Sequence, residues 1–205
     1  DMLYEVDMNN KQYTSLALSV VTGILMLCLG GCVSSGNIKN ASVDKAKALD
    51  LHVQLARGYV EKANRESARH HLRKAAEINK NSADATEVMA LLYQLEGETQ
   101  LAEAAFKKAI RAKKNFTIAH NDYGVFLFEN KRYEEALAQF ELAAADLDYN
   151  GRGSALINVG RTAAALGHRE RARSAFEHAA ILDRNLSEAH IELADMYLAD
   201  QDYAK

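Results

Sequence analysis

The sequence contains no proline and only two cysteines among its 205 residues. Both cysteines, Cys28 and Cys32, lie near the beginning of the chain, which excludes a fold held together by a disulfide framework. Neither sign of charge is in large excess, since 25 basic residues face 28 acidic ones and the basic residues form no stripe. This charge balance argues against nucleic-acid binding. Sustained alternation of apolar and polar residues is also missing, so nothing in the sequence predicts a β-strand.

What the sequence does have is small and large apolar residues that return at a fixed interval. An alanine recurs every 34 residues, with one interval of 36, at Ala68, Ala102, Ala136 and Ala172. A second alanine follows seven residues after each of these, at Ala75, Ala109, Ala143 and Ala179. A large apolar residue lies between the two each time: Leu72, Phe106, Phe140 and Phe176. A period of this length, made of two helices, is typical of a solenoid whose stacked units bury a shared core.

Taking Leu49 as the start of the first unit places the later starts at residues 83, 117, 153 and 187. The eighth position is then always small, so two helices can approach closely there: Ala56, Ala90, Gly124, Gly160 and Ala194. An ordinary helical bundle would not keep this register through four units. Over residues 45–205 the chain resembles the tetratricopeptide repeat family. The resemblance implies an all-α fold, a right-handed superhelical solenoid of helix pairs, whose last unit is truncated at Lys205.

The missing prolines matter at position 32 of each unit, where the family usually has a proline that stops the second helix. Here asparagines follow that position, and we expect them to take the left-handed conformation that ends a helix: Asn81, Asn115 and Asn185. Ser82, Thr117 and Ser187 are expected to cap the helices that follow. Two extra residues lie within residues 146–153, so the connection between the third and fourth units is longer and contains two glycines.

The N-terminal segment has a different pattern from the repeats. From Met8, a plausible start, it contains Lys11, an apolar run over residues 16–29, and then Gly30, Gly31 and Cys32. The run is shorter than the roughly 20 residues that a transmembrane helix needs, and the pattern is that of a signal peptide. Its end resembles the bacterial lipoprotein box, in which cleavage precedes a cysteine that receives lipid. An ordinary secretory signal is the alternative.

We therefore expect residues 1–31 to be a lipoprotein signal peptide and residues 32–44 to be a lipidated Cys32 with a flexible tether. The repeat domain then covers residues 45–205. Several acyl chains on Cys32 would anchor the protein stably to a membrane. The resemblance to lipoproteins, with Val33 after the cysteine, implies the periplasmic face of the outer membrane. The leader removes three acidic residues and one basic residue, so the mature chain has a net charge of −1.

No group of side chains in the sequence points to catalysis, a cofactor or a metal. His70 and His71 are adjacent, so on a helix they point about 100° apart and cannot both face one ion. Three further histidines share position 4, a packing position, and we expect them to fill interfaces: His52, His120 and His190. No glycine-rich phosphate loop follows a strand. We expect a protein that is not an enzyme and holds neither cofactor nor metal.

In the tetratricopeptide family the first helices of the units line a groove. The corresponding positions here predict a largely apolar protein-binding groove with two amides: Val53, Val88, Leu91, Leu95, Asn121, Val125, Phe128, Ile157 and Asn158. Such a groove suits an amphipathic helix or an extended apolar segment, and Phe128 is the expected hot spot. Alternatively, neighbouring repeats or the N-terminal segment cover some of these side chains. Arg57 and Arg161 also occupy groove positions, but the other Lys and Asn residues of a carboxylate clamp are missing.

Residues 120–127 (HNDYGVFL) and 132–136 (RYEEA) resemble a stretch of the type IV pilus biogenesis lipoproteins. The long connection with Asp148, Tyr149 and Arg152 is similar to theirs as well. This resemblance implies a pilotin, a lipid-anchored periplasmic scaffold that binds the outer-membrane secretin of the pilus and assists its localisation and assembly. Another outer-membrane repeat lipoprotein, which serves barrel assembly or cell-wall hydrolases, is the alternative. In both cases the expected partners are a protein and a membrane.

Overall fold

A computed structural model describes residues 37–203 of the chain. Every regular element in that range is an α-helix, and the helices are α2 (Asn37–Glu61), α3 (Arg65–Ile78), α4 (Ala83–Glu96), α5 (Thr99–Ala112), α6 (Thr117–Glu129), α7 (Tyr133–Ala144), α8 (Arg152–Ala165), α9 (Arg169–Leu182) and α10 (Ser187–Tyr203). Backbone contacts divide the chain into two units, Asp1–Asp44 and Lys45–Lys205. Most of α2 and all the later helices belong to the larger of these, Lys45–Lys205.

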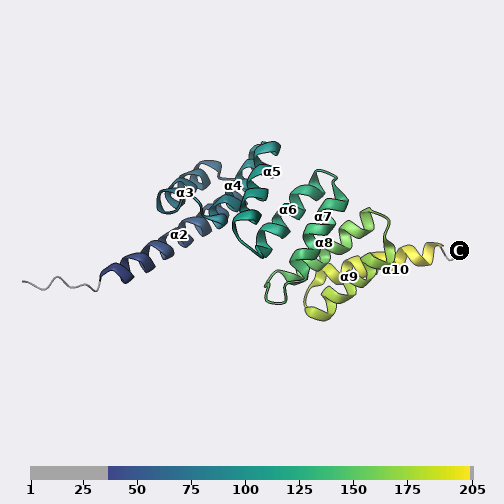
Figure 1. The fold of residues 1–205 in the computed structure, drawn as a ribbon. Coiled ribbons are helices and arrows are strands. Elements are labelled where there is room, and N and C mark those ends of the chain that lie inside the picture. Colours follow the sequence, from purple (N-terminus) through teal and green to yellow (C-terminus); the bar gives the residue numbers. More distant parts are fainter. Residues whose placement is uncertain (1–36, 204–205) are drawn as a thin grey trace, which may run out of the picture. The chain divides into compact units, whose positions relative to one another are not determined.

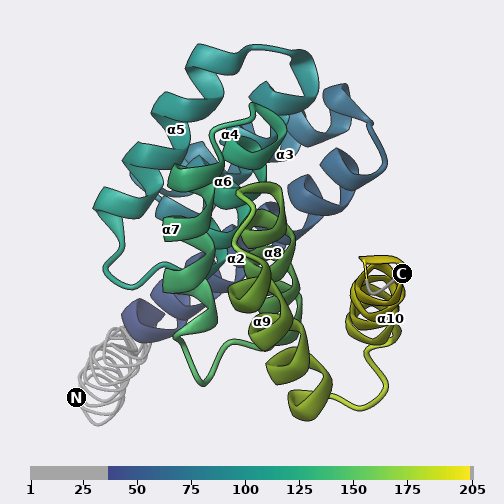
Figure 2. The same ribbon diagram turned by 90° about the vertical axis from the view of Figure 1, so that its right-hand side faces the viewer.

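The helices of the larger unit form pairs that stack in chain order (Figures 1 and 2). Helix α4 packs on α5, α6 on α7 and α8 on α9, and each pair also contacts the next one. The first helices of successive pairs touch as well, α4 with α6 and α6 with α8. Helices α4, α6 and α10 begin at the residues where the 34-residue period places repeat starts, and α8 begins one residue earlier. The chain is therefore a helical solenoid, as its periodicity predicts.

The first helix begins earlier than expected. Helix α2 starts at Asn37, so residues 37–44 are helical, and the prediction of a flexible tether is wrong for them. Beyond Gly36 this segment contains neither glycine nor proline, and it continues without a break into the helix of the first repeat. The predicted signal peptide, Cys32 and the tether residues up to 36 lie outside the described residues.

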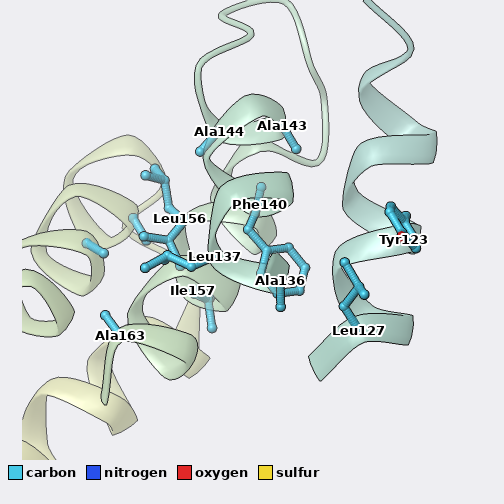
Figure 3. Packing of buried hydrophobic residues seen from close by; sticks show 14 of the residues in the cluster. Tyr123, Leu127, Ala136, Leu137, Phe140, Ala143, Ala144, Leu156, Ile157 and Ala163 are labelled. Atoms are coloured by element: carbon cyan, nitrogen blue, oxygen red, sulfur yellow. The ribbon is translucent and has the colours of Figure 1, made fainter. Parts of the chain in front are cut away.

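The core repeats along the chain in the same way as the sequence. The large residues between the two alanine series are all buried: Leu72, Phe106, Phe140 and Phe176. Figure 3 shows how one of them is enclosed, since Phe140 of α7 lies between Tyr123 of α6 and Ile157 of α8. Each stacked pair thus adds one large side chain to the core: Phe106, Phe140 and Phe176 share one apolar cluster, and Leu72 lies in a second one.

The small residue at position 8 is required by the ring that faces it. A Cβ atom built on Gly160 would lie 2.4 Å from a ring carbon of Phe176. One built on Gly124 would lie 2.7 Å from the ring of Phe140. Both distances are well below van der Waals contact, so the third and fourth pairs can close this tightly only with glycine.

The turns inside the pairs share one conformation. A residue one or two positions after the end of the first helix has a positive φ in each of them: Ala63 (54°), Gly97 (80°), Lys131 (60°) and Gly167 (78°). The next N–H then donates to a carbonyl five residues earlier, for example from Asn64 to Tyr59 at 2.8 Å. This is the Schellman motif, which satisfies carbonyl groups at a helix end.

The connections between pairs use several devices. Asn115 has a φ of 55°, as expected for a left-handed helix end, but Asn81 and Asn185 do not have a positive φ. Their N–H groups donate instead to the side chains of the residues two before them, Asn79 at 3.0 Å and Asp183 at 2.9 Å. These side-chain contacts turn the chain without a left-handed residue.

Capping also follows the prediction only in part. The Ser82 hydroxyl accepts from the N–H of Ala85 at 3.1 Å and so caps α4. Thr117 does not cap α6, because its hydroxyl donates to the carboxylate of Asp146 in the long connection.

Candidate functional site

Helices α6 and α8 enclose a pocket of about 260 Å³, which we call the Phe128 pocket. Three of the predicted groove residues line it, Val125, Phe128 and Asn158. Arg161, which also occupies a groove position, and Phe140 of the periodic core line it as well, whereas the sequence did not single out Glu129 and Thr162. The Phe128 ring is half-buried and meets Tyr133 edge-on, with 5.1 Å between the ring centroids. Phe128 is thus held by a neighbouring ring while part of its surface remains open.

The remaining apolar groove residues divide into two groups. Leu91 and Leu95 are half-buried on α4. Val53, Val88 and Ile157 are only 8%, 0% and 1% exposed, so the expectation that they line an open groove is wrong. Val53 and Val88 lie in one cluster of buried apolar residues and Ile157 lies in another, so the packing of the surrounding helices covers them.

Polar side chains connect the first helices in series, and we call these contacts the inner polar row. The Asn158 amide on α8 donates to Asn121 on α6 at 3.3 Å. Farther along α6, Glu129 accepts from the amide of Gln94 on α4 at 2.6 Å. At the other end of the array, Arg161 on α8 contacts Glu192 on α10 at 2.5 Å. The two predicted groove amides, Asn121 and Asn158, are therefore hydrogen-bonded to each other.

The most buried part of the row is a cluster of three charged residues. Arg57 on α2 pairs with Glu87 on α4, and its other terminal nitrogen lies 3.0 Å from a carboxylate oxygen of Asp122 on α6. Glu87 is fully buried, and its Oε1 atom has no hydrogen-bond partner among the described residues. Burial raises the pKa of Glu87 well above its usual range, and the positive charge of Arg57 opposes that rise.

These pairings decide what the two arginines can do. The guanidinium of Arg57 is held by Glu87 and Asp122, and that of Arg161 is held by Glu192 with Glu188 at 3.7 Å. Neither cation is free to hold the terminal carboxylate of a peptide. The open part of this face is consequently mostly apolar, with Asn158, Glu129 and the paired Arg161 among its polar lining residues.

The long connection between α7 and α8 extends toward the same cluster. Tyr149 is half-buried and packs against the main core. Its burial raises its pKa, and the negative charge of Asp122 adds to the effect. Gly151 gives the ring room, because a Cβ there would lie 2.6 Å from Tyr149. The sequence singled out this loop by its two extra residues but held no signal for where Tyr149 would pack.

The position-4 histidines behave as expected in two of three cases. Nδ1 of His52 lies 3.0 Å from Nδ1 of His71, and Nδ1 of His120 lies 2.8 Å from the amide oxygen of Gln139. Both contacts fill the interface within a helix pair. His190, in contrast, is exposed.

The described part of the chain contains neither a cluster of metal-binding side chains nor a helix that could span a membrane. Over residues 37–203, no three His, Cys, Asp or Glu side chains gather in a way that could hold a metal ion. No helix in this range is long and apolar enough to cross a bilayer.

The paired helices, the 34-residue period and the small-residue contacts define a tetratricopeptide-repeat protein, and the profile of this repeat matches residues 85–116. The chain is 35% identical over 182 residues to the type IV pilus assembly protein PilF of Pseudomonas aeruginosa, across 88% of this chain and 72% of that protein. The solved structure of P. aeruginosa PilF superimposes with a TM-score of 0.73 at 34% identity, covering 78% of this chain and 72% of that one.

A second solved structure, that of PilW, is described as a widely conserved type IV pilus biogenesis factor. It superimposes with a TM-score of 0.65 at 25% identity, covering 74% of this chain and 69% of PilW. An uncharacterised protein of Haemophilus influenzae is 28% identical over 136 residues, across 66% of this chain and 74% of that protein. The chain belongs to the PilF family of tetratricopeptide-repeat proteins of type IV pilus assembly. Repeat proteins of this kind are generally scaffolds that bind other proteins.

Proposed function

We propose that this protein is a lipid-anchored scaffold on the periplasmic face of the outer membrane, where it binds the secretin of the type IV pilus and assists its localisation and assembly. The observation that carries the proposal is the Phe128 pocket, an open apolar site in a protein whose relatives assemble type IV pili. A half-exposed phenylalanine fixed by a second ring is the kind of residue that dominates binding energy at protein interfaces.

The pocket is suited to an apolar side chain that projects from a helix or an extended segment. Asn158 at its edge supplies an amide that can hydrogen-bond to the partner. The inner polar row links α6 to the first helices on both sides, so these residues are ordered before a partner arrives. Preorganisation of this kind lowers the entropic cost of binding.

The lipid at Cys32 would add affinity in a different way. Two partners confined to one membrane meet at a high effective concentration, so binding tightens without any new contact. This half of the proposal depends on Cys32 alone, whereas the first half depends on the Phe128 pocket. Each can therefore be tested separately.

Secretin binding at the Phe128 pocket is tested by purifying the tagged protein, together with any bound secretin, from cells that assemble pili. Phe128→Asp is expected to reduce secretin recovery at least thirtyfold, corresponding to a hot-spot loss of about 2 kcal/mol. Leu142→Asp is the matched control, since Leu142 is an exposed apolar residue on α7. Circular dichroism should show unchanged helicity for both variants. Full secretin recovery with folded Phe128→Asp protein would refute binding at this pocket.

The anchor is tested by mass spectrometry and membrane fractionation. The wild-type protein is expected in the outer-membrane fraction, with the mass of an acylated chain that begins at Cys32. Cys32→Ser should remove the added mass and shift the protein to the soluble periplasmic fraction. An unmodified Cys32 in wild-type protein would exclude the lipid anchor and leave the groove test unaffected.

A further inference from the structure

A second pocket lies between α3 and α5, on a different face of α4 from Leu91 and Leu95. It has a volume of about 350 Å³, within the range of sites that bind small ligands or single side chains. We call it the outer pocket. Its wall is mostly apolar and includes Leu72, Ala76, Met89, Ala104 and Ala105.

Two lysines stand at the rim of the outer pocket. Lys80, just beyond the end of α3, and Lys108 on α5 both line it, and the lining contains no acidic residue. Both lysines are exposed, and within the described residues neither forms an ion pair or a hydrogen bond. Other lysines nearby are paired, Lys107 with Glu103 at 2.7 Å and Lys113 with Asp84 at 2.8 Å. The two rim lysines thus leave uncompensated positive charge beside an apolar surface.

The equivalent pocket one repeat later carries a different set of charges. It lies between α5 and α7 and has a volume of about 400 Å³. Its lining includes Lys107, which pairs with Glu103, Glu135, which pairs with Arg132, and Arg111. An acidic residue thus accompanies the two basic ones there, whereas the lining of the outer pocket has two lysines and no acidic residue.

We propose that the outer pocket binds a short acidic segment of a partner protein. One large apolar side chain of that segment fills the pocket, and carboxylates on either side of it contact Lys80 and Lys108. Charge complementarity identifies the occupant as acidic, and the recessed apolar wall identifies it as a peptide with a protruding side chain rather than a layer of lipid headgroups. The site is separate from the Phe128 pocket and does not depend on the function proposed above.

The probe is a fluorescent nine-residue peptide with Leu-Phe at its centre and Asp or Glu at every other position. Its binding to the full chain is measured by fluorescence anisotropy at low and high salt, beside an analogue in which lysines replace the acidic residues. The acidic peptide should bind at least tenfold more tightly than the basic analogue, and its affinity should fall as salt rises.

Amino-acid substitutions show whether the acidic peptide binds at the outer pocket. Lys80→Glu with Lys108→Glu should weaken the acidic peptide at least tenfold, and Ala104→Trp should block it by filling the pocket from an exposed position. Lys107→Glu with Arg111→Glu changes the same number of charges at the neighbouring pocket and should have little effect, as should Phe128→Asp.

The proposal would be overturned by equal binding of the two peptides, by no binding of the acidic one, or by binding that Ala104→Trp leaves unchanged. Vesicles containing phosphatidylglycerol serve as a further probe. If they bind and compete with the peptide at Lys80 and Lys108 regardless of Ala104→Trp, the site recognises lipid headgroups and the peptide assignment is wrong.

Discussion

Replacing Ala63 with glycine is expected to stabilise the protein, although no contact is gained. Ala63 has a φ of 54° in the first of four matching turns, and Lys131 has 60° in the third. A left-handed conformation costs a residue with a side chain roughly 1–2 kcal/mol. Glycine avoids that cost but adds about 0.5–1 kcal/mol of unfolded-state entropy. Subtracting the midpoint of the second range from that of the first gives a net stabilisation of about 0.75 kcal/mol for Ala63→Gly and, separately, for Lys131→Gly.

The second and fourth turns provide the reciprocal test. Gly97 and Gly167 hold the same place with φ values of 80° and 78°. No atom would lie within 4 Å of a Cβ at either position, so only backbone conformation is changed by alanine there. Gly97→Ala and Gly167→Ala should therefore destabilise by about 0.5–1 kcal/mol each.

Urea unfolding followed by circular dichroism measures all four variants under the same conditions. In thermal unfolding, monitored in the same way, a change of 1 kcal/mol in the free energy of unfolding corresponds to about 2–4 °C in Tm for a protein of this size. Ala63→Gly and Lys131→Gly should add in the double variant, because the two turns lie in different repeats. The reasoning fails if the glycine variants are neutral or destabilising while the alanine variants leave stability unchanged.

Two further predictions concern pH. Hydrogen bonds from Lys107, Arg132 and Tyr123 lower the pKa of Glu103 from 4.5 to about 2. Between these pH values the folded protein binds fewer protons at Glu103 than the unfolded chain does. The stabilisation that Glu103 provides above pH 4.5 is therefore lost as the pH falls toward 2. Glu103→Gln should cost about 1–2 kcal/mol at pH 7, after allowance for solvent screening, and much less at pH 3; equal losses in urea unfolding at both pH values would contradict this assignment. Burial and the neighbouring His52 and His70 lower the pKa of His71 from 6.5, so stability should fall as pH drops below about 6.5. His71→Gln, which copies the contact of His120 with Gln139, should reduce this loss in thermal unfolding between pH 7.5 and 5.5, and an unchanged pH profile would refute the effect of His71.

Much of the fold could be predicted because the repeated residues act locally. An alanine or glycine at position 8 and a phenylalanine at position 24 must meet within one helix pair, as Gly160 and Phe176 do. Their 34-residue spacing therefore determines where pairs begin. The beginning of α2 was missed, because a segment without glycine or proline can be helical whether or not it belongs to a repeat.

The candidate site was harder to predict, since it depends on contacts between units. Position numbers alone placed Val53, Val88 and Ile157 on an open surface, but the packing of neighbouring helices buries them in the core. The partner of Arg57 on α6 is Asp122, 65 residues away, and no local pattern joins these two positions. Phe128 and Asn158 are only partly buried, and they line the pocket between α6 and α8.

The contact from Arg57 to Asp122 has a consequence for how the array comes apart. In a strictly nearest-neighbour array the first unit could detach without affecting the third. Here, loss of α2 would deprive Asp122 of its cation and leave the buried Glu87 without the charge that offsets its burial. Removing one member of a buried ion pair is strongly unfavourable. Fraying from the N-terminal side is therefore resisted by three units together, and those units should open as one cooperative block.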